Sequence, residues 1–187
     1  MRRHYDKVGL PLEQVRRYLE SGPLVLVSSA WQGERDIMTM GWHTVMEFSP
    51  SLVGCVIARG NHSFELVRQS RACVLNVPTV DLIDEVVGIG TSTGSEGDKF
   101  ERFGLSAQGQ EGVEAPAIAE CVASFGCRLH DDSLVDKYNF FIWEVVSAQV
   151  ARSPRHPRTL HYTGDGEFMV AGKVVRRRTP GILDKEP

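Results

Sequence analysis

Long apolar runs and paired cysteines are both missing from this 187-residue sequence. No stretch approaches the ~20 consecutive apolar residues of a membrane-spanning helix, and the N-terminal Met-Arg-Arg-His-Tyr-Asp segment lacks the apolar core of a secretion signal. The four cysteines form no C-x-x-C pair and have no histidine at zinc-ligand spacing, which argues against a metal site and a redox dithiol. We therefore expect a cytoplasmic protein with reduced, buried thiols and no membrane contact.

Neither sign of charge is in large excess. The net charge is −3, with 42% apolar and 24% charged residues, which is ordinary for a globular domain with one core. The one dense basic run, Arg176-Arg177-Arg178, indicates a solvated tail rather than a nucleic-acid-binding patch. We expect one domain over residues 23–173, an N-terminal helical extension over residues 1–22 and a C-terminal tail over residues 174–187.

Sequence patterns typical of strands outnumber those typical of helices. The chain has no internal repeat, and its strand and helix segments do not alternate strictly, which argues against a doubly wound parallel sheet. We therefore predict a mainly β fold, an antiparallel barrel with short peripheral helices. The expected strands are residues 24–29, 37–45, 52–58, 72–77, 119–129, 138–151 and 167–171, with a turn at 32–36, and the expected helices are residues 12–21, 63–70, 82–87 and 98–104.

Several familiar catalytic patterns are absent. The serine, histidine and carboxylate residues show no spacing that singles out a hydrolytic triad, and no paired carboxylates stand out as a general acid and base. The segment Gly88-Ile-Gly90-Thr-Ser-Thr-Gly94 is one residue longer than a dinucleotide fingerprint and follows an expected helix, so we reject a Rossmann site. This loop, which contains Ser92 and precedes Lys99, is either close to a cofactor or a flexible surface loop.

Two junctions contain residues that suit a flat ligand with a phosphate. Arg59, His62 and Ser63 lie where an expected strand leads into a helix, and the free N–H groups of a helix N-terminus favour an anion. The alternative is an ordinary capping turn with a solvated arginine. The segment Thr39-Met40-Gly41-Trp42 either lines a planar ring, because glycine allows close backbone approach, or is an inward strand with a bulge at Gly41.

The order of these motifs along the chain points to one family. The motifs are Met38-Thr39-x-Gly41-Trp42, Ser49-Pro50, Arg59-x-x-His62-Ser63-x-x-Leu66, Asn76-Val77-Pro78, Asp98-Lys99-Phe100, Ala115-Pro116-x-Ile118, Tyr138 to Val146, and Leu160-His-Tyr-x-Gly-x-Gly-x-Phe168. In this order they resemble the flavin reductase-like proteins, whose fold is an FMN-binding split barrel, and in particular the flavoredoxin type. The resemblance spans about residues 23–173.

The resemblance implies an FMN bound at the interface of a homodimer. Residues Thr39 to Trp42 would then line the isoalloxazine ring, Asn76 and Val77 would border it, and the loop with Ser92 would lie beside the cofactor. The phosphate would be held by Arg59, His62, Ser63 and Lys99. Hydride would pass directly from NADH or NADPH to the flavin, which requires positioning more than a protein acid or base, so we assign no certain catalytic residue.

One position departs from the family pattern. Many of these reductases have Gly-Asp-His before the last long strand, with the histidine near the nicotinamide, whereas this chain has Asp136-Lys137-Tyr138. Tyr138 therefore stands near the expected nicotinamide site, and Trp143 replaces a small residue beyond it. Either ring could stack on a different donor or partly block a nicotinamide.

Two functions stay open from the sequence. One is an NAD(P)H-dependent flavin reductase that supplies reduced flavin to a partner such as a flavin-dependent monooxygenase. The other is a flavoredoxin-type electron carrier with tightly bound FMN, a redox partner protein and no nicotinamide site. A third alternative is a binding module that has lost its cofactor.

Overall fold

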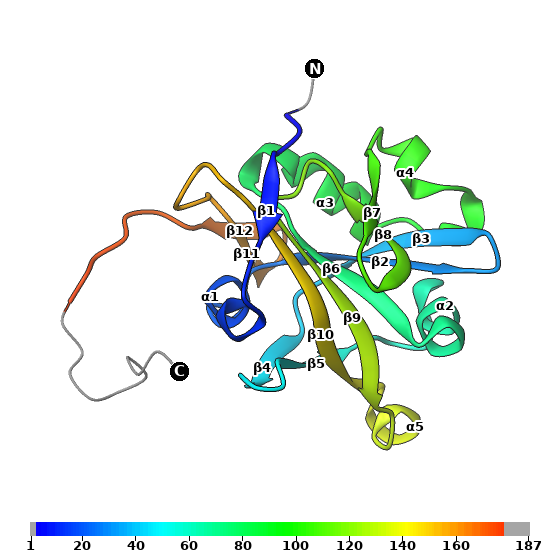
Figure 1. The fold of residues 1–187 in the computed structure, drawn as a ribbon. Coiled ribbons are helices and arrows are strands. Elements are labelled where there is room, and N and C mark those ends of the chain that lie inside the picture. The colour runs from blue at the N-terminus through cyan, green and yellow to red at the C-terminus, as the bar shows by residue number, and fades with distance from the viewer. Residues whose placement is uncertain (1–2, 178–187) are drawn as a thin grey trace.

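A curled antiparallel sheet forms the body of the protein (Figure 1). The computed structural model describes residues 3–177. Seven strands follow the order β3-β2-β6-β9-β10-β5-β4, and β1 adds to the far end of β10. These strands are β1 (Lys7–Gly9), β2 (Val25–Trp31), β3 (Glu34–Met40), β4 (His43–Glu47), β5 (Leu52–Val56), β6 (Ala72–Val77), β9 (Ala123–Asp131) and β10 (Phe140–Ala151). Two separate hairpins complete the strands, β7 (Ala107–Gln110) with β8 (Val113–Ile118) and β11 (Leu160–Gly164) with β12 (Glu167–Val170).

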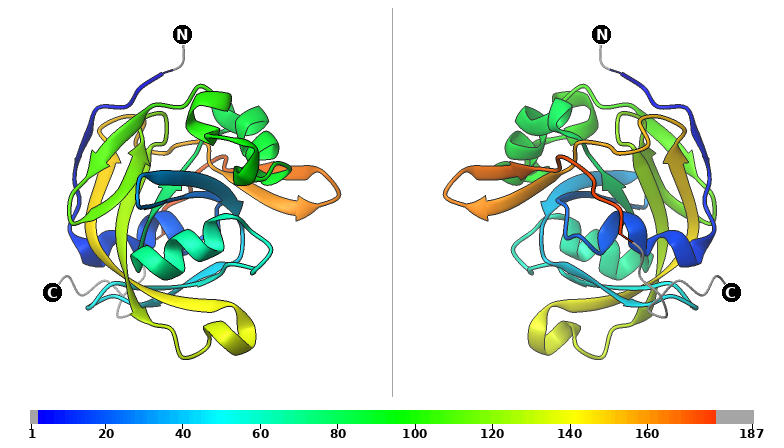
Figure 2. Two further views of the ribbon diagram at one scale, coloured as in Figure 1. Left: turned by 90° about the vertical axis from the view of Figure 1, so that its right-hand side faces the viewer. Right: turned by 90° about the vertical axis from the view of Figure 1, so that its left-hand side faces the viewer.

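The barrel is split along one side. β3 and β4 lie at opposite ends of the strand order, yet only Gly41 and Trp42 separate them in the sequence. The sheet therefore curls until its two edges approach each other, and the chain rather than a hydrogen-bonded ladder joins them (Figure 2). Among the described strands, none pairs with the outer edge of β3 or of β4. The predicted mainly β split barrel is confirmed.

Apolar side chains on both faces of the sheet create two cores. On β2, Val25 and Val27 face the barrel interior, where they pack with Phe64, Phe125 and other apolar residues. The alternate residue Leu26 faces outward into a second core beneath the helices after β6. β2 is buried on both faces for this reason, which explains its continuous apolar and small-residue sequence.

Short helices lie around the ends of the barrel (Figure 1). The predicted helix over residues 63–70 is confirmed as α2 (Ser63–Ser70), and α4 (Lys99–Arg102) begins at the cap Asp98, whose carboxylate accepts the backbone N–H of Phe100. The helix α3 (Ile83–Gly90) continues past Gly88, where we expected it to end. A 3₁₀ turn at Gly94–Glu96 occupies part of the loop that follows. The last helix, α5 (Val135–Tyr138), was not expected.

The N-terminal segment is only partly helical. A 3₁₀ turn at Leu12–Gln14 precedes the four-residue helix α1 (Arg16–Leu19), so the expected helix over residues 12–21 is wrong in extent. Val15 and Leu19 are buried in the barrel core, and β1 pairs with β10, so this segment packs on the barrel. Residues 1–2 of the expected extension and 178–187 of the expected tail lie outside the described residues.

Several strand boundaries differ from the prediction, including that of β9, which begins at Ala123 rather than at residue 119. Three further differences follow from local backbone conformation. The turn between β2 and β3 is confined to Gln32 and Gly33, both with positive φ as in a tight hairpin, so residues 34–36 belong to β3 rather than to a turn. Extended structure over residues 37–45 is interrupted at Gly41 and Trp42. β10 begins at Phe140, because α5 precedes it and Asn139 takes a left-handed conformation.

Candidate functional site

The break between β3 and β4 presents an exposed backbone and a large exposed aromatic side chain. Gly41 is exposed and the Trp42 side chain is 75% exposed. The carbonyl of Trp42 accepts the N–H of Val56, which fixes this peptide to β5. An exposed tryptophan beside free strand edges suits a flat ligand whose polar edge meets main-chain groups. The structure therefore places two of the predicted ring-lining residues, Gly41 and Trp42, at an open position.

The two residues before this break face the protein instead. Met40 is buried in the barrel core. The hydroxyl of Thr39 donates to the carbonyl of Val86 at 2.7 Å, and an added Cβ on Gly90 would lie 3.3 Å from the Thr39 Cβ. Thr39 thus packs β3 against α3. Contact between these two residues and a cofactor stays a prediction. Such a contact would be made by their backbone atoms.

A buried carboxylate occupies the centre of the predicted phosphate site. Asp36, on β3, is 1% exposed; its Oδ2 accepts the Ser63 hydroxyl at 2.6 Å, and its Oδ1 lies 3.3 Å from the Lys99 ammonium. Lys99 also donates to the carbonyl of Ile37 at 2.8 Å. Asp36 thereby compensates the charge of Lys99 and orients the Ser63 hydroxyl inside the protein. The structure brings these two predicted residues together, but around Asp36 rather than around an open anion site.

The loop after α3 closes over this carboxylate. An added Cβ on Gly94 would lie 2.5 Å from both Asp36 Oδ1 and His62 Cδ2, so only glycine allows this close approach. Ser92, in the same loop, is half-buried, and its hydroxyl lies 3.4 Å from the carbonyl of Ile89, so it packs onto the end of α3. The loop therefore lies beside the first turn of α2, as an ordered cover for Asp36.

Two basic side chains at the start of α2 are closer to the surface. His62 is half-buried, and its Nε2 lies 2.6 Å from Glu34 Oε1. Arg59 is about half exposed and pairs with Asp136 of α5 at 2.8 Å. Exposed pairs of this kind contribute little to stability, typically about 0–1 kcal/mol. Both side chains can therefore turn toward a bound anion at small cost.

The predicted pair at the end of β6 is buried. Asn76 is fully enclosed; its amide N–H groups point to Leu26 O, Ser28 Oγ and Val74 O, while its carbonyl accepts from Ile118 N and Ser124 Oγ. Val77 is also fully buried. The Asn76 side chain is thus a polar link between β2, β6, β8 and β9, with its hydrogen-bonding capacity used inside the protein. A cofactor contact from these two residues stays a prediction.

The two aromatic residues near the start of β10 have opposite environments. Tyr138 ends α5 and is 55% exposed, with the Lys137 ammonium 5.0 Å from its ring centre. Trp143 is fully buried and stacks on Phe141 at 5.5 Å between ring centres. The idea that Trp143 stacks on a redox donor is wrong, because this face of β10 forms the barrel core. Only Tyr138 is positioned to meet a ligand.

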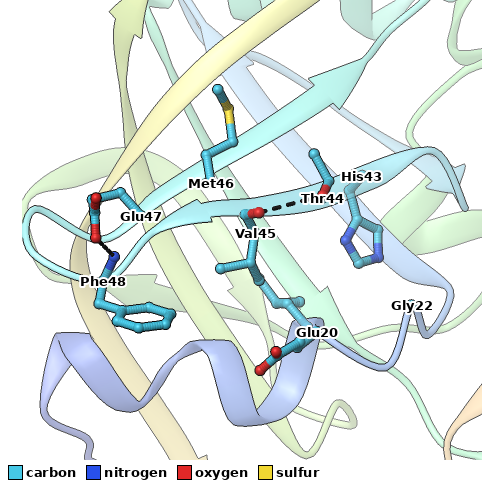
Figure 3. A pocket seen from close by; sticks show the side chains of 9 residues that line it. Glu20, Gly22, His43, Thr44, Val45, Met46, Glu47 and Phe48 are labelled. Carbon is cyan, nitrogen blue, oxygen red and sulfur yellow. Dashed lines mark hydrogen bonds between the residues drawn. The ribbon is translucent and has the colours of Figure 1, made fainter. Parts of the chain in front are cut away.

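A hollow of about 460 Å³ lies between α1 and β4 (Figure 3). His43, next to Trp42, directs its ring toward α1, and its Nε2 lies 2.7 Å from the carbonyl of Pro23. Burial lowers the pKa of His43, so the imidazole is neutral and Nε2 carries the proton that it donates to this carbonyl. Glu20 and Glu47 supply two carboxylates to the hollow. Sequence reasoning did not identify this site.

Three carboxylates at the candidate site were missed by sequence reasoning. The side chains expected to bind a phosphate are instead paired with Glu34, Asp36 and Asp136. The sequence does hold a signal for Asp36, because Asp36 stands two residues after Glu34 on the same side of a strand. The signal was lost because residues 32–36 were interpreted as a turn.

Comparison with known proteins decides the family. A model described as "Flavin reductase like domain" matches residues 16–180. The chain belongs to the flavin reductase-like family. The Escherichia coli K12 protein YddH, described as uncharacterized, is 29% identical over 182 residues, covering 90% of this chain and 96% of its own. An uncharacterized Archaeoglobus fulgidus protein is 29% identical over 111 residues, covering 59% of this chain and 63% of its own.

Solved structures agree with this flavin reductase-like assignment. An FMN-binding domain of a flavin reductases-like enzyme from Shewanella baltica OS155 superposes with a TM-score of 0.87 at 25% identity, covering 94% of this chain and all of its own. The flavoredoxin of Desulfovibrio vulgaris (Miyazaki F) superposes with a TM-score of 0.77 at 18% identity, covering 86% and 92%. The second likeness supports the split-barrel fold.

Among the described helices of this flavin reductase-like chain, none is long and apolar enough to cross a membrane.

Proposed function

We propose that this protein is a cytoplasmic FMN-binding oxidoreductase and that it works as an NAD(P)H-dependent flavin reductase. One observation carries the proposal: in a chain of this family, the barrel is split at an exposed Gly41-Trp42 segment between two unpaired strand edges. Free main-chain groups beside an exposed aromatic ring are what an isoalloxazine requires from a protein, namely a flat surface and partners for its polar edge.

The residues at the start of α2 fit the phosphate end of FMN. Arg59 and His62 supply adjustable cationic or donor groups, and α2 is long enough for its N-terminal N–H groups to favour an anion. Ser63 and Lys99 would act indirectly, because both already bind Asp36. Their role would be to hold the first turn of α2 against β3 and α4, and so to keep the anion-binding turn in place.

When bound, FMN would supply the hydride-accepting ring, and the protein would supply position. Trp42 would cover part of the ring, and the backbone at Gly41 would approach its edge. Tyr138, on the exposed end of α5, would meet a nicotinamide or another donor from a separate element. No side chain at the exposed break is arranged as a proton donor or acceptor, which agrees with a reaction driven by orientation and exclusion of water.

We propose further that two copies form a homodimer. Exposed apolar side chains gather on β4 and its turn, where Trp42, Met46 and Phe48 are 75%, 44% and 37% exposed. A second copy that covered this surface would remove apolar area from water and enclose a flat cofactor on its open side.

A flavoredoxin-type carrier is the second candidate. The observation that favours it is Tyr138, which stands at the predicted nicotinamide position with a bulky exposed ring and a cation over it. Such a ring could exclude a nicotinamide while leaving the flavin edge open to a redox partner protein. In the reductase alternative, the partner would be a protein such as a flavin-dependent monooxygenase that receives reduced flavin.

One spectroscopic experiment distinguishes the flavin reductase from the electron carrier. The purified protein with one equivalent of FMN is kept anaerobic, and its visible absorption is recorded before and after NADH and then NADPH. The reductase proposal predicts perturbed flavin bands that bleach promptly with one nucleotide. Bands that persist until dithionite is added would replace the reductase with the carrier, and an unperturbed free-FMN spectrum would exclude both.

A further inference from the structure

The C-terminal part of the chain differs in charge from the rest. Residues 1–151 contain 13 lysines and arginines against 20 aspartates and glutamates, a net charge of −7, whereas residues 152–177 contain six against two, a net charge of +4. A charge separation of this size creates a long-range attraction between the C-terminal part of one molecule and the body of another.

Five of the six cations of this C-terminal part have no carboxylate partner within the described chain. Arg152 pairs with Asp6, but in residues 3–177 no ion pair involves the side chains of Arg155, Arg158, Lys173, Arg176 or Arg177. The barrel shows the opposite pattern, because most of its surface arginines are paired with carboxylates. These paired arginines are Arg16, Arg35, Arg59, Arg68, Arg71 and Arg102.

The segment of residues 173–177, here called the C-terminal arm, combines these cations with exposed apolar side chains. Val174 and Val175 are 53% and 60% exposed. Figure 1 shows the chain after β12 leading away from the barrel, so the arm does not lie on its own body. In an extended chain, residues two apart share a face, so one face carries Val174 with Arg176 and the other carries Val175 with Arg177.

The hollow between α1 and β4 has the complementary composition. Leu19, Val45 and Phe48 give it an apolar lining, and Figure 3 shows Val45 and Phe48 on the side of β4 that faces α1. Its two carboxylates are Glu20, which pairs with Arg16 at 3.1 Å, and Glu47, which within residues 3–177 accepts the N–H of Phe48 and no other hydrogen bond. Within the described chain, no lysine or arginine lines the hollow, and Arg16 lies at its edge, 5.0 Å from the centre of the Phe48 ring and paired with Glu20. Glu47 has no ion-pair partner there and is available to a guanidinium.

We propose that the C-terminal arm of one copy binds in this hollow on a second copy. One valine of the arm would contact the apolar lining, and the arginine two residues later would meet Glu47 or Glu20. Five extended residues span about 16 Å, a length suited to a surface hollow. Two-fold symmetry would make the exchange reciprocal, with each copy giving one arm and receiving one. The proposal rests on the homodimer of the proposed function, and the family match includes the arm, because it extends to residue 180.

Engineered cysteines test this contact directly. Glu47→Cys and Val175→Cys are placed on separate, differently sized chains that are co-expressed, purified together and mildly oxidised. Because all four natural cysteines are buried, they give little background. We expect a disulfide-linked product of one chain of each size on a non-reducing gel. The matched control replaces Glu47→Cys with Glu101→Cys, an exposed residue of α4, and should give at least ten times less linked product.

A chain with both substitutions separates the possible occupants. The proposal predicts a linked dimer, whereas a fast-migrating monomer with an internal disulfide would show that the arm fills its own hollow and would overturn the proposal. Absence of any linked product in both experiments would overturn it as well. Light scattering and an FMN titration on the same samples distinguish a failure of the arm contact from a failure of the flavin assignment. A dimer that binds FMN but forms no disulfide refutes only the arm contact. A disulfide-linked dimer that does not bind FMN refutes only the flavin assignment.

Discussion

At the scale of single residues, the candidate site depends on which cations stay free to meet a ligand. Lys99 is bound to Asp36 and Ile37 inside the protein, whereas Arg59 is half exposed and its ion-pair partner is the exposed carboxylate of Asp136. We therefore predict that Arg59→Gln weakens FMN binding about 10- to 100-fold, as expected for a charge-assisted hydrogen bond worth about 1.5–3 kcal/mol. Flavin fluorescence quenching measures the affinity.

Two comparisons make the Arg59 prediction specific to the phosphate. Riboflavin lacks the phosphate, so its affinity should change less than threefold in the variant. Arg71→Gln removes a similar exposed pair, with Asp132 at 2.9 Å, and should leave FMN affinity unchanged. Equal losses for FMN and riboflavin would contradict a phosphate contact by Arg59.

His43 gives a pH-dependent prediction. Burial lowers the pKa of His43 in the folded protein, so the unfolded chain binds more protons between the folded pKa and about 6.5. The free energy of unfolding should therefore fall as the pH decreases below about 6.5. Urea denaturation between pH 5 and 8 should show this fall, and His43→Gln should reduce its slope. His156→Gln, at an exposed histidine, serves as the control, and an equal slope in both variants would refute the assignment.

From residue types alone, only some of the site residues could be assigned correctly as exposed or buried. The sequence indicated correctly that a Gly-Trp pair and an Arg-x-x-His pair stand at junctions, because glycine and capping patterns mark breaks in regular structure. It did not reveal that Asn76 and Lys99 are enclosed, since burial of a polar group depends on partners distant in the sequence, here Ile118 for Asn76 and Asp36 for Lys99.

At the scale of elements, Lys99 and Asp36 connect β3 with the starts of α2 and α4. Removing one partner of a buried ion pair leaves the other charge uncompensated, which typically costs about 3–5 kcal/mol. Lys99→Met should therefore lower the free energy of unfolding by this amount in chemical denaturation. Adding Asp36→Asn should recover part of the loss, because the buried charge is then absent.

Arg102, in the same helix as Lys99, provides the reference stability loss for an exposed ion pair. Arg102 pairs with Glu96 at 2.9 Å, with both side chains about half exposed, so Arg102→Met should cost less than about 0.5 kcal/mol. If Lys99→Met cost no more than Arg102→Met, the pair would not connect these elements as described.

Elements with strong local signals were predictable, and elements that depend on distant partners were not. α2 and β6 matched their predicted ranges, since an apolar stripe and a buried run ending at Pro78 are local features. The strands β1, β7, β8 and β11 were missed, because short strands of mixed polarity are specified by their pairing, here β1 with β10, β7 with β8 and β11 with β12. Tyr138 was assigned to a strand because α5 has only four residues.

At the scale of the whole molecule, the thiols report on the integrity of the barrel. Cys55, Cys73, Cys121 and Cys127 are all buried. Burial raises the pKa of Cys121 to about 12 and raises the pKa values of Cys55 and Cys73 well above the usual range. An Ellman titration should detect no fast-reacting thiol in the native protein and four after denaturation. A native thiol that reacts as fast as free cysteine would contradict this packing.

The split barrel could be predicted from the sequence, but the position of its split edge could not. Strand composition and the motif order indicated a mainly β split barrel, and the family match agrees. That β3 and β4 lie at opposite ends of the strand order depends on pairing across the whole sheet, which strand patterns do not specify. This global arrangement leaves Gly41 and Trp42 at the opening and gives the candidate site its location.

The most direct test of this account is an FMN titration of the purified protein, followed by visible absorption and flavin fluorescence, with riboflavin as the comparison. The split edge with Trp42 and the turn that carries Arg59 and His62 predict saturable binding of one FMN per chain, perturbed flavin bands and weaker binding of riboflavin. A free-flavin spectrum that stays unchanged at saturating protein would contradict the assignment of this opening as a flavin site.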